Sequence, residues 1–223
     1  MTTVAIAGAS GVVGIRALHH LLSREEVHRV VAMGRRVLPV TDEKLLSRVV
    51  ERWTEEAIAS ALPDDVAVAV SCLGTTMRQA GSKGAFRAVD HDAVVAFAAA
   101  ARARGARRFL LVSSLGASAR SRNFYLRTKG EAEEALARLG YPQLTILRPS
   151  FIDDQGARRE FRLGERVGLP LARAAFAVLG RRGRYAPIAA DDIASALVRL
   201  AFDATEERLR IVESERLHAG APA

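Results

Sequence analysis

The residues whose types and spacing are most able to do chemistry are a tyrosine and a lysine four positions apart, Tyr125 and Lys129. On a helix, positions i and i+4 share a face, so both side chains can address one bound molecule. A tyrosine hydroxyl can give or take a proton at a carbonyl or alcohol oxygen, but its usual pKa of about 10 is too high for neutral operation. A nearby ammonium stabilises the phenolate and lowers that pKa. The pair therefore predicts acid–base chemistry at an oxygen atom.

Two serines before this pair could hold the same oxygen atom. Ser113 and Ser114 follow an apolar strand pattern, and a serine hydroxyl at that place would orient the substrate. We favour Ser114 and keep Ser113 as the alternative. With three tyrosines and three lysines in the chain, a chance match to this spacing is expected about 0.04 times. The competing interpretation of the tyrosine and lysine is an exposed pair on a helix.

A glycine-rich turn near the start of the chain has the pattern that binds dinucleotide phosphates. An apolar strand over Val4–Ala7 runs into GASGVVG and then into a helical pattern. In this pattern Gly8 permits the turn, Gly11 lets the backbone approach a pyrophosphate, and Gly14 lets helix and strand pack closely. The helix N-terminus offers N–H groups and partial positive charge to the phosphates. The competing interpretation is a turn without a ligand.

The residues after the second and fourth strand patterns indicate which dinucleotide binds and where it lies. Arg35 and Arg36 stand where a site that prefers NAD usually has Asp or Glu, and two guanidinium groups can pair with a 2′-phosphate. We therefore predict NADP(H), with a solvated turn as the alternative. Small residues after the fourth strand lie where an open α/β sheet holds its ligand, and they are Cys72, Leu73 and Gly74. No histidine is placed to activate Cys72, so we predict no thiol catalysis.

The elements that must position these residues alternate between strand and helix patterns. The expected strands are Val4–Ala7, Val30–Met33, Val49–Arg52, Val66–Ser71, Arg108–Ser113 and Thr145–Arg148. The expected helices are Val12–Leu22, Glu55–Leu62, Ala85–Arg104 and Leu126–Leu139. This alternation predicts the α/β class, with a Rossmann-type doubly wound parallel sheet flanked by helices in a single domain, 1–223. From Phe151 onward the pattern is irregular, and we expect 151–190 to fold over the sheet edge on the substrate side.

Several segments together resemble a known family. GASGVVG, SCLGTT, AGSKGAFRAVD, VSSLGAS, NFYLRTKGEAE and ILRPS, in this order, are similar to the atypical short-chain dehydrogenases related to the Tat-interacting protein. The similarity spans about residues 3 to 217. It implies catalytic roles for Tyr125, Lys129 and one of the two serines, and a ribose contact for Lys129. It matches Gly8, Ser10, Gly11, Gly14 and Arg35 to cofactor positions.

The resemblance extends the expected cofactor site and shows one departure. To the cofactor-binding set we add Val12 and Val13 of GASGVVG and Arg148 and Pro149 of ILRPS. Many short-chain dehydrogenases have an asparagine in the helix after the fourth strand, where this chain has Asp90. A proton relay of the usual composition is therefore in doubt. Asp90 could instead cap a helix or form an ion pair.

Composition excludes several classes of protein. One cysteine permits no internal disulfide, and the five histidines lack ligand spacing, so we predict no metal site. The net charge of +8 comes mostly from arginines spread along the chain, without blocks or interleaved aromatics, so nucleic-acid binding is not expected. The sequence does not show the signal-peptide pattern of a charged region followed by an apolar run. Its apolar runs are also too short to span a membrane. We therefore expect a cytoplasmic protein.

These observations predict an NADP(H)-dependent oxidoreductase that transfers hydride to or from a small carbonyl or alcohol substrate. The alternative is a regulatory or interaction protein that binds NADP(H) without turnover. The substrate pocket should form within Phe151 to Pro187, and a monomer or a homodimer fits the sequence equally. Aromatic side chains of that segment could line an apolar wall of the pocket, with the core as the alternative, and these are Phe151, Phe161, Phe176 and Tyr185. Its arginines could meet an acidic substrate, with the surface as the alternative, and these are Arg158, Arg159 and Arg162.

Overall fold

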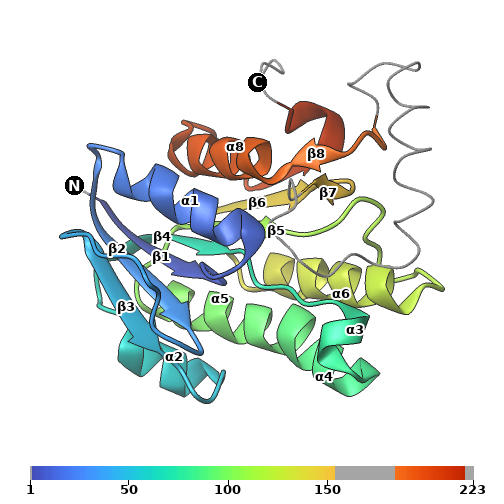
Figure 1. Ribbon diagram of the computed structural model, residues 1–223, viewed down its shortest axis with the longest axis horizontal. Helices are drawn as coiled ribbons and strands as arrows, with labels where there is room; N and C mark the ends of the chain where they lie inside the picture. The colour runs from blue at the N-terminus through green and yellow to red at the C-terminus, as the bar shows by residue number, and fades with distance from the viewer. Residues whose placement is uncertain (1, 154–183, 219–223) are drawn as a thin grey trace.

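A seven-stranded parallel sheet runs through the centre of the computed structural model, which describes residues 2–153 and 184–218 (Figure 1). The strand order is β3-β2-β1-β4-β5-β6-β9, and every neighbouring pair is parallel. The strands are β1 (Thr2–Ala7), β2 (Val27–Gly34), β3 (Leu45–Val49), β4 (Val66–Ser71), β5 (Arg108–Val112), β6 (Gln143–Arg148) and β9 (Leu209–Glu213). A separate two-stranded sheet joins β7 (Ile152–Asp153) to β8 (Ile188–Ala189).

Helices cover both faces of the sheet. They are α1 (Val12–Leu22), α2 (Glu55–Ala61), α3 (Met77–Ala80), α4 (Lys83–Arg87), the π-helical turn η1 (Ala88–Asp92), α5 (Ala93–Ala103), α6 (Phe124–Arg138), α8 (Ala190–Phe202) and the 3₁₀ turn η2 (Ser214–Arg216). Helices α1 and α8 pack together on one face, while α2, α5 and α6 lie on the other (Figure 1). This arrangement confirms the predicted Rossmann-type α/β fold.

The central strands are continuously apolar because both of their faces are covered. In β1, Val4 to Ala7 are fully buried, and Val4 and Ile6 face one core while Ala5 and Ala7 face the other. A strand buried on both sides needs such a run, since no position faces water. The chain passes from β1 to β2 and β3 on one side and then returns to β4 on the other. The carboxyl ends of β1 and β4 therefore flank the switch point where open α/β sheets bind ligands.

Some expected elements are confirmed and others are corrected. Helix α1 has the predicted bounds, and the predicted helix Ala85–Arg104 is present as α4, η1 and α5 in succession. The predicted third strand Val49–Arg52 is wrong, since β3 spans Leu45–Val49 and pairs with Val30–Gly34 of β2. As an edge strand it is only partly buried, so its apolar pattern is weak.

The irregular pattern predicted after Phe151 is only partly correct. The chain does return to the sheet edge, where β9 pairs with β6, but the amphipathic helix α8 and strand β9 were not predicted. Most of the expected substrate-side segment 151–190 lies outside the described residues. Within the described part, Phe151 and Tyr185 are exposed.

Candidate active site

The glycine-rich turn after β1 packs directly against the end of β4. Gly8 has a φ of +81°, and a Cβ placed on it would lie 2.6 Å from the carbonyl carbon of Cys72. A Cβ on Gly14 would lie 2.2 Å from the carbonyl oxygen of Gly8. A side chain at Gly8 would therefore push the turn away from the end of β4, and one at Gly14 would push α1 away from the turn. The two glycines keep β1, β4 and α1 close together at the switch point.

Helix α1 begins without a side-chain cap. Side chains cap the first turns of four other helices, and these are Thr54, Thr76, Ser82 and Asn123. The N-cap of α1 is Gly11, which has no side chain to accept from the N–H groups of Val12, Val13 and Gly14. An uncapped N-terminus with its partial positive charge is suited to a phosphate. The chemistry of this turn therefore fits the pyrophosphate of a dinucleotide.

The remaining residues of GASGVVG take different positions around that turn. Ser10 is exposed beside it, and Val12 is half-buried. The side chain of Val13 is buried in the core below α1. Val13 can therefore contact a ligand only through its backbone, while the Ser10 hydroxyl is accessible.

The two arginines after β2 are open to solvent. Arg35 and Arg36 are both exposed, and within the described part of the chain neither has an ion-pair partner. The N–H of Val50, after β3, donates to the carbonyl of Gly34 at 2.9 Å and holds the end of β2. Both guanidinium groups are thus available to an anionic ligand at this edge of the sheet.

The segment after β4 connects the phosphate turn to the tyrosine and lysine. The N–H of Cys72 donates to the carbonyl of Ala7 at 2.8 Å, and Leu73 packs against the core on the α5 side. A Cβ on Gly74 would lie 3.5 Å from Oδ1 of Asp90 and 3.7 Å from Nζ of Lys129. Burial raises the pKa of the Cys72 thiol to about 12, so the thiolate is scarce at neutral pH. This agrees with the prediction that Cys72 is not a nucleophile.

The tyrosine and lysine lie on the first two turns of α6. Asn123 caps the helix by accepting from the N–H of Leu126 at 3.2 Å. Tyr125 is half-buried, with its ring centroid 5.6 Å from that of Phe86 in α4. Lys129 is buried one turn later. The structure therefore contradicts the alternative of an exposed helix pair.

A buried ion pair holds the lysine. Nζ of Lys129 lies 2.8 Å from Oδ1 of Asp90, and Oδ2 of Asp90 accepts from the N–H of Thr75 at 2.8 Å. Burial alone lowers the pKa of Lys129, but the charges of Asp90, Tyr125 and Glu133 outweigh it and raise that pKa above its usual value. The ammonium therefore stays charged at neutral pH. Of the two roles open to Asp90, the structure shows the ion pair.

Asp90 lies in a π-helical turn, Ala88–Asp92, of the helix that carries it. Asp90 is 1% exposed, although Asp92, two residues later, is exposed. Such turns insert a residue into a helix and are frequent at functional sites. Here the turn lies between α4 and α5, beside α6. The sequence pattern contained no sign of it.

The two serines after β5 differ in what their hydroxyl groups contact. The hydroxyl of Ser113 is buried and donates to Oε1 of Glu133 in α6. The hydroxyl of Ser114 makes only a long contact of 3.5 Å with the carbonyl of Leu115. Ser114, which is half-buried, is thus the better placed of the two to donate to a substrate. This supports the preference for Ser114.

The two residues expected at the cofactor from ILRPS have internal partners. The guanidinium of Arg148 donates to Glu133 at 2.5 Å from Nη2 and to Glu213 at 3.3 Å from Nη1. The buried Pro149 accepts at its carbonyl from the N–H of Leu115 at 2.8 Å. Their contact with a cofactor stays a prediction. What the structure shows is that both hold the segment after β5.

Sequence reasoning missed two residues of α6 that position the site. A Cβ on Gly130 would lie 2.2 Å from the carbonyl carbon of Ser118, so the helix contacts the loop after β5 without intervening side chains. An isolated glycine inside a helical pattern is a signal of such packing, and it could have been used. Glu133, which accepts from both Ser113 and Arg148, gave no comparable signal.

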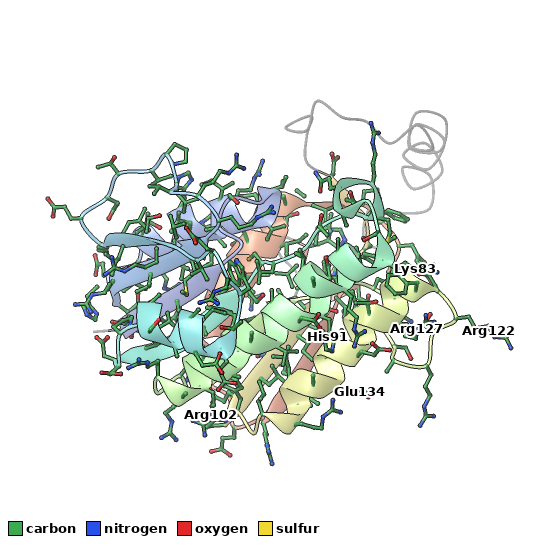
Figure 2. All side chains as sticks on the ribbon, turned by 90° about the horizontal axis from the view of Figure 1, so that it is seen from below. Lys83, His91, Arg102, Arg122, Arg127 and Glu134 are labelled. Carbon is green, nitrogen blue, oxygen red and sulfur yellow. The ribbon has the colours of Figure 1, made fainter. Side chains whose placement is uncertain are left out.

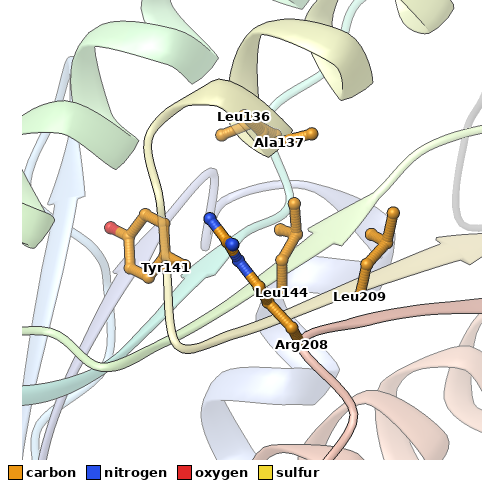
Figure 3. A pocket seen from close by; sticks show the side chains of 6 residues that line it. All are labelled: Leu136, Ala137, Tyr141, Leu144, Arg208 and Leu209. Carbon is orange, nitrogen blue, oxygen red and sulfur yellow. The ribbon is translucent and has the colours of Figure 1, made fainter.

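A shallow apolar cavity lies elsewhere in the molecule. It has a volume of about 220 Å³ and lies beside the C-terminal turn of α6 and the first residues of β6 and β9 (Figure 3). Its lining is formed by Leu136, Ala137, Tyr141, Leu144, Arg208 and Leu209. It is therefore at the opposite end of the strands from the glycine turn and Lys129.

Two kinds of feature are absent from the part of the chain that the structure describes. Among residues 2–153 and 184–218, no cluster of three or more His, Cys, Asp and Glu side chains could hold a metal ion. In the same part of the chain, no helix has the length and apolar character needed to cross a bilayer.

Comparison with known proteins shows the family and the fold of the chain. Residues 8–204 match a family model described as NAD(P)H-binding. The chain is 30% identical over 220 residues to "Protein FMP52, mitochondrial" of Eremothecium gossypii, covering 95% of this chain and 94% of that protein. A short-chain dehydrogenase/reductase family oxidoreductase from Burkholderia thailandensis is similar in structure, with a TM-score of 0.66, 19% identity and coverage of 99% and 94%. MoeE5 in complex with UDP-glucuronic acid and NAD gives a TM-score of 0.70 at 18% identity, covering 95% and 76%.

These comparisons confirm one expectation and overturn another. The resemblance to atypical short-chain dehydrogenases, as NAD(P)-binding Rossmann proteins, is confirmed. The expectation of a cytoplasmic protein is wrong, because the relatives that match over most of the chain are named as mitochondrial. That expectation was based on the absence of a signal-peptide pattern and of a long apolar run, and neither absence argues against a mitochondrial location.

Proposed function

This chain belongs to the NAD(P)H-binding family, and from that premise we propose that it is an NADP(H)-dependent oxidoreductase acting on a small carbonyl or alcohol. The observation that carries the proposal is the buried, charged Lys129 one helical turn from Tyr125. A permanent ammonium at this place has a clear use if the neighbouring tyrosine must reach its phenolate form at neutral pH. The structural neighbours, which include dehydrogenases and epimerases, support an oxidoreductase.

Each residue of the site has one role in this proposal. The Tyr125 hydroxyl gives its proton to the substrate oxygen during reduction and takes it back during oxidation. Lys129 stabilises the phenolate that remains, and Asp90 holds the Lys129 ammonium in place. Ser114 donates a hydrogen bond to the same oxygen and orients it. NADP(H), when bound, supplies or accepts the hydride.

The preference for NADP(H) over NAD(H) depends on Arg35 and Arg36. Both guanidinium groups are exposed at the end of β2, next to the glycine turn in the sheet order. Positions 35 and 36 carry no Asp or Glu that could accept from a ribose hydroxyl. A 2′-phosphate offers them charge-assisted and bidentate contacts.

The proposed partner is a small molecule, and a monomer or a homodimer could carry this activity. The names of the relatives support a mitochondrial location for the chain. Binding of nucleic acid is not part of the proposal, because the arginines are dispersed along the chain.

The test is a panel of small aldehydes, ketones and quinones, followed through the absorbance of NADPH. Turnover by the wild type that is lost in Tyr125→Phe would support the proposal, because that change removes one hydroxyl and little else. Turnover that Tyr125→Phe retains would contradict the mechanism. Tight NADPH binding with no turnover of any carbonyl would favour the alternative, a protein that binds NADP(H) without catalysis.

A further inference from the structure

A second buried polar group lies on α6, one turn beyond Lys129, and the proposed mechanism does not use it. The carboxylate of Glu133 is 6% exposed. It accepts from the hydroxyl of Ser113 after β5 and from Nε and Nη2 of Arg148 in β6, at 3.1 and 2.5 Å for the two nitrogens. Arg148 also pairs with Glu213 of β9. The Glu133 carboxylate therefore connects the middle of α6 to the ends of β5 and β6, and through Arg148 to β9.

The electrostatics of this group favour a fixed geometry. A hydrogen bond to Glu133 raises the pKa of Arg148 above its usual value, and burial opposes that effect without outweighing it. A planar guanidinium that binds one carboxylate through two nitrogens allows little rotation. Arg148 thus fixes the orientation of the Glu133 carboxylate, and Oε1 of that carboxylate also accepts from the hydroxyl of Ser113.

The contact determines what Ser113 can do. A serine hydroxyl has one proton, and Ser113 donates it to Glu133. Its backbone is held as well, because its N–H donates to the carbonyl of Leu147 at 2.7 Å. The N–H of Leu115, two residues after Ser113, donates to the carbonyl of Pro149 at 2.8 Å. Ser114 therefore lies between two anchored neighbours while its own hydroxyl stays available.

We propose that Glu133 is a positioning residue, which acts through Ser113 to hold Ser114 in place for the substrate oxygen. Ser113 is then a support and not the residue that contacts the substrate. The loop it supports also contacts the catalytic helix directly, since the N–H of Ser118 donates to the carbonyl of Leu126 at 3.1 Å. The catalytic part of this inference depends on the proposed function, whereas its structural part does not.

The experiment compares Glu133→Gln, Ser113→Ala and the double variant. Its matched control is Glu134→Gln, on the same helix, whose side chain is exposed (Figure 2). The first readout is amide hydrogen exchange of the peptide that covers Ser113 to Ser118, which needs no substrate. The second is kcat and KM for the best carbonyl of the panel, together with NADPH affinity measured by fluorescence.

We expect Glu133→Gln to speed exchange in that peptide by about fivefold or more, because opening of a locally stabilised segment becomes easier. It should lower kcat by about tenfold to a hundredfold, the usual effect of a small misplacement of a positioned group. NADPH affinity should change by less than about threefold, since the phosphates bind at α1. Ser113→Ala should produce the same changes to a smaller extent, and the double variant should resemble Glu133→Gln alone.

Unchanged exchange in Ser113→Ala would overturn the proposal, and this variant is the safer one if Glu133→Gln does not fold. Additive losses in the double variant would also overturn it, because Glu133 would then act independently of Ser113. If the wild type turns over no carbonyl, the proposed function fails, but the exchange readout still decides whether Glu133 holds the Ser113 segment.

Discussion

Replacing Asp90 by asparagine tests the buried ion pair on which the site depends. The pair is enclosed, with side-chain exposures of 5% for Lys129 and 0% for Asp90. Nζ of Lys129 and the N–H of Thr75 face different oxygens of Asp90, and in an asparagine one of these two atoms becomes an NH2 donor that cannot accept. Breaking a buried pair by removing one partner typically costs about 3–5 kcal/mol, since a charge is left uncompensated. We expect Asp90→Asn to be destabilised by that amount.

In a chain of this size, 1 kcal/mol shifts Tm by about 2–4 °C, so the expected loss is about 6–20 °C at neutral pH. The assay is thermal unfolding of the cofactor-free protein followed by circular dichroism. The matched control is Asp64→Asn, which breaks the exposed pair of Asp64 with Arg104. Exposed pairs contribute at most about 1 kcal/mol, so the control should stay within about 4 °C of the wild type.

The pH dependence of this difference has a definite sign. The pKa of Lys129 is raised in the folded wild type, so its contribution is complete below the usual lysine pKa of about 10.4 and is lost as the pH rises above it. Burial is the largest single influence on the pKa of Lys129, and we expect it to outweigh the remaining charges and lower that pKa once Asp90 is removed. The folded variant then favours neutral Lys129, and its penalty fades as the pH rises. The gap in Tm should therefore be largest at neutral pH and narrower near pH 10.

A double variant separates the uncompensated charge from simple loss of contacts. Asp90→Asn combined with Lys129→Met removes the buried ammonium as well, and it should melt at a higher temperature than Asp90→Asn alone. If Asp90→Asn melts within about 2 °C of the wild type, or the double variant melts no higher than the single one, the reasoning is refuted.

Three further variants test the cofactor and catalytic residues. Tyr125→Phe should lower turnover by about 10²–10⁴-fold while NADPH affinity measured by fluorescence stays constant, and retained turnover would contradict the assigned role. Arg35→Ala should weaken NADPH binding about tenfold to a hundredfold more than NADH binding by calorimetry, whereas equal weakening would argue against a 2′-phosphate contact. Gly11→Val should abolish binding of both cofactors, because the new side chain would occupy the space that a pyrophosphate needs. Its circular dichroism spectrum should stay unchanged, because the φ of −79° tolerates a side chain and a Cβ 3.2 Å from the Gly8 carbonyl oxygen needs a shift of only a few tenths of an ångström. Undiminished binding in Gly11→Val would mean that the turn holds no phosphate.

Local patterns were enough for much of the fold. The bounds of α1 follow from a glycine turn and an apolar face of helical period, both of which depend on neighbouring residues alone. The buried strands β1 and β4 are continuous apolar runs for the same reason. The edge strand β3 was misplaced because partial burial leaves a weak pattern. Strand β9 is also an edge strand, with Leu209 and Ile211 exposed, and it was not predicted.

The sequence by itself determined the glycine turn, the arginines after β2 and the spacing of Tyr125 and Lys129, because each of these depends on residues within one or two helical turns. Only the tertiary structure decided what Asp90 and Glu133 do. Their partners come from other elements, and Asp90 lies in a π-helical turn that no sequence pattern indicated. A carboxylate on a helix looks the same in the sequence whether it faces water or a buried lysine. Packing of α5 against β4 and of α6 against β6 buries these two carboxylates and makes them part of the site.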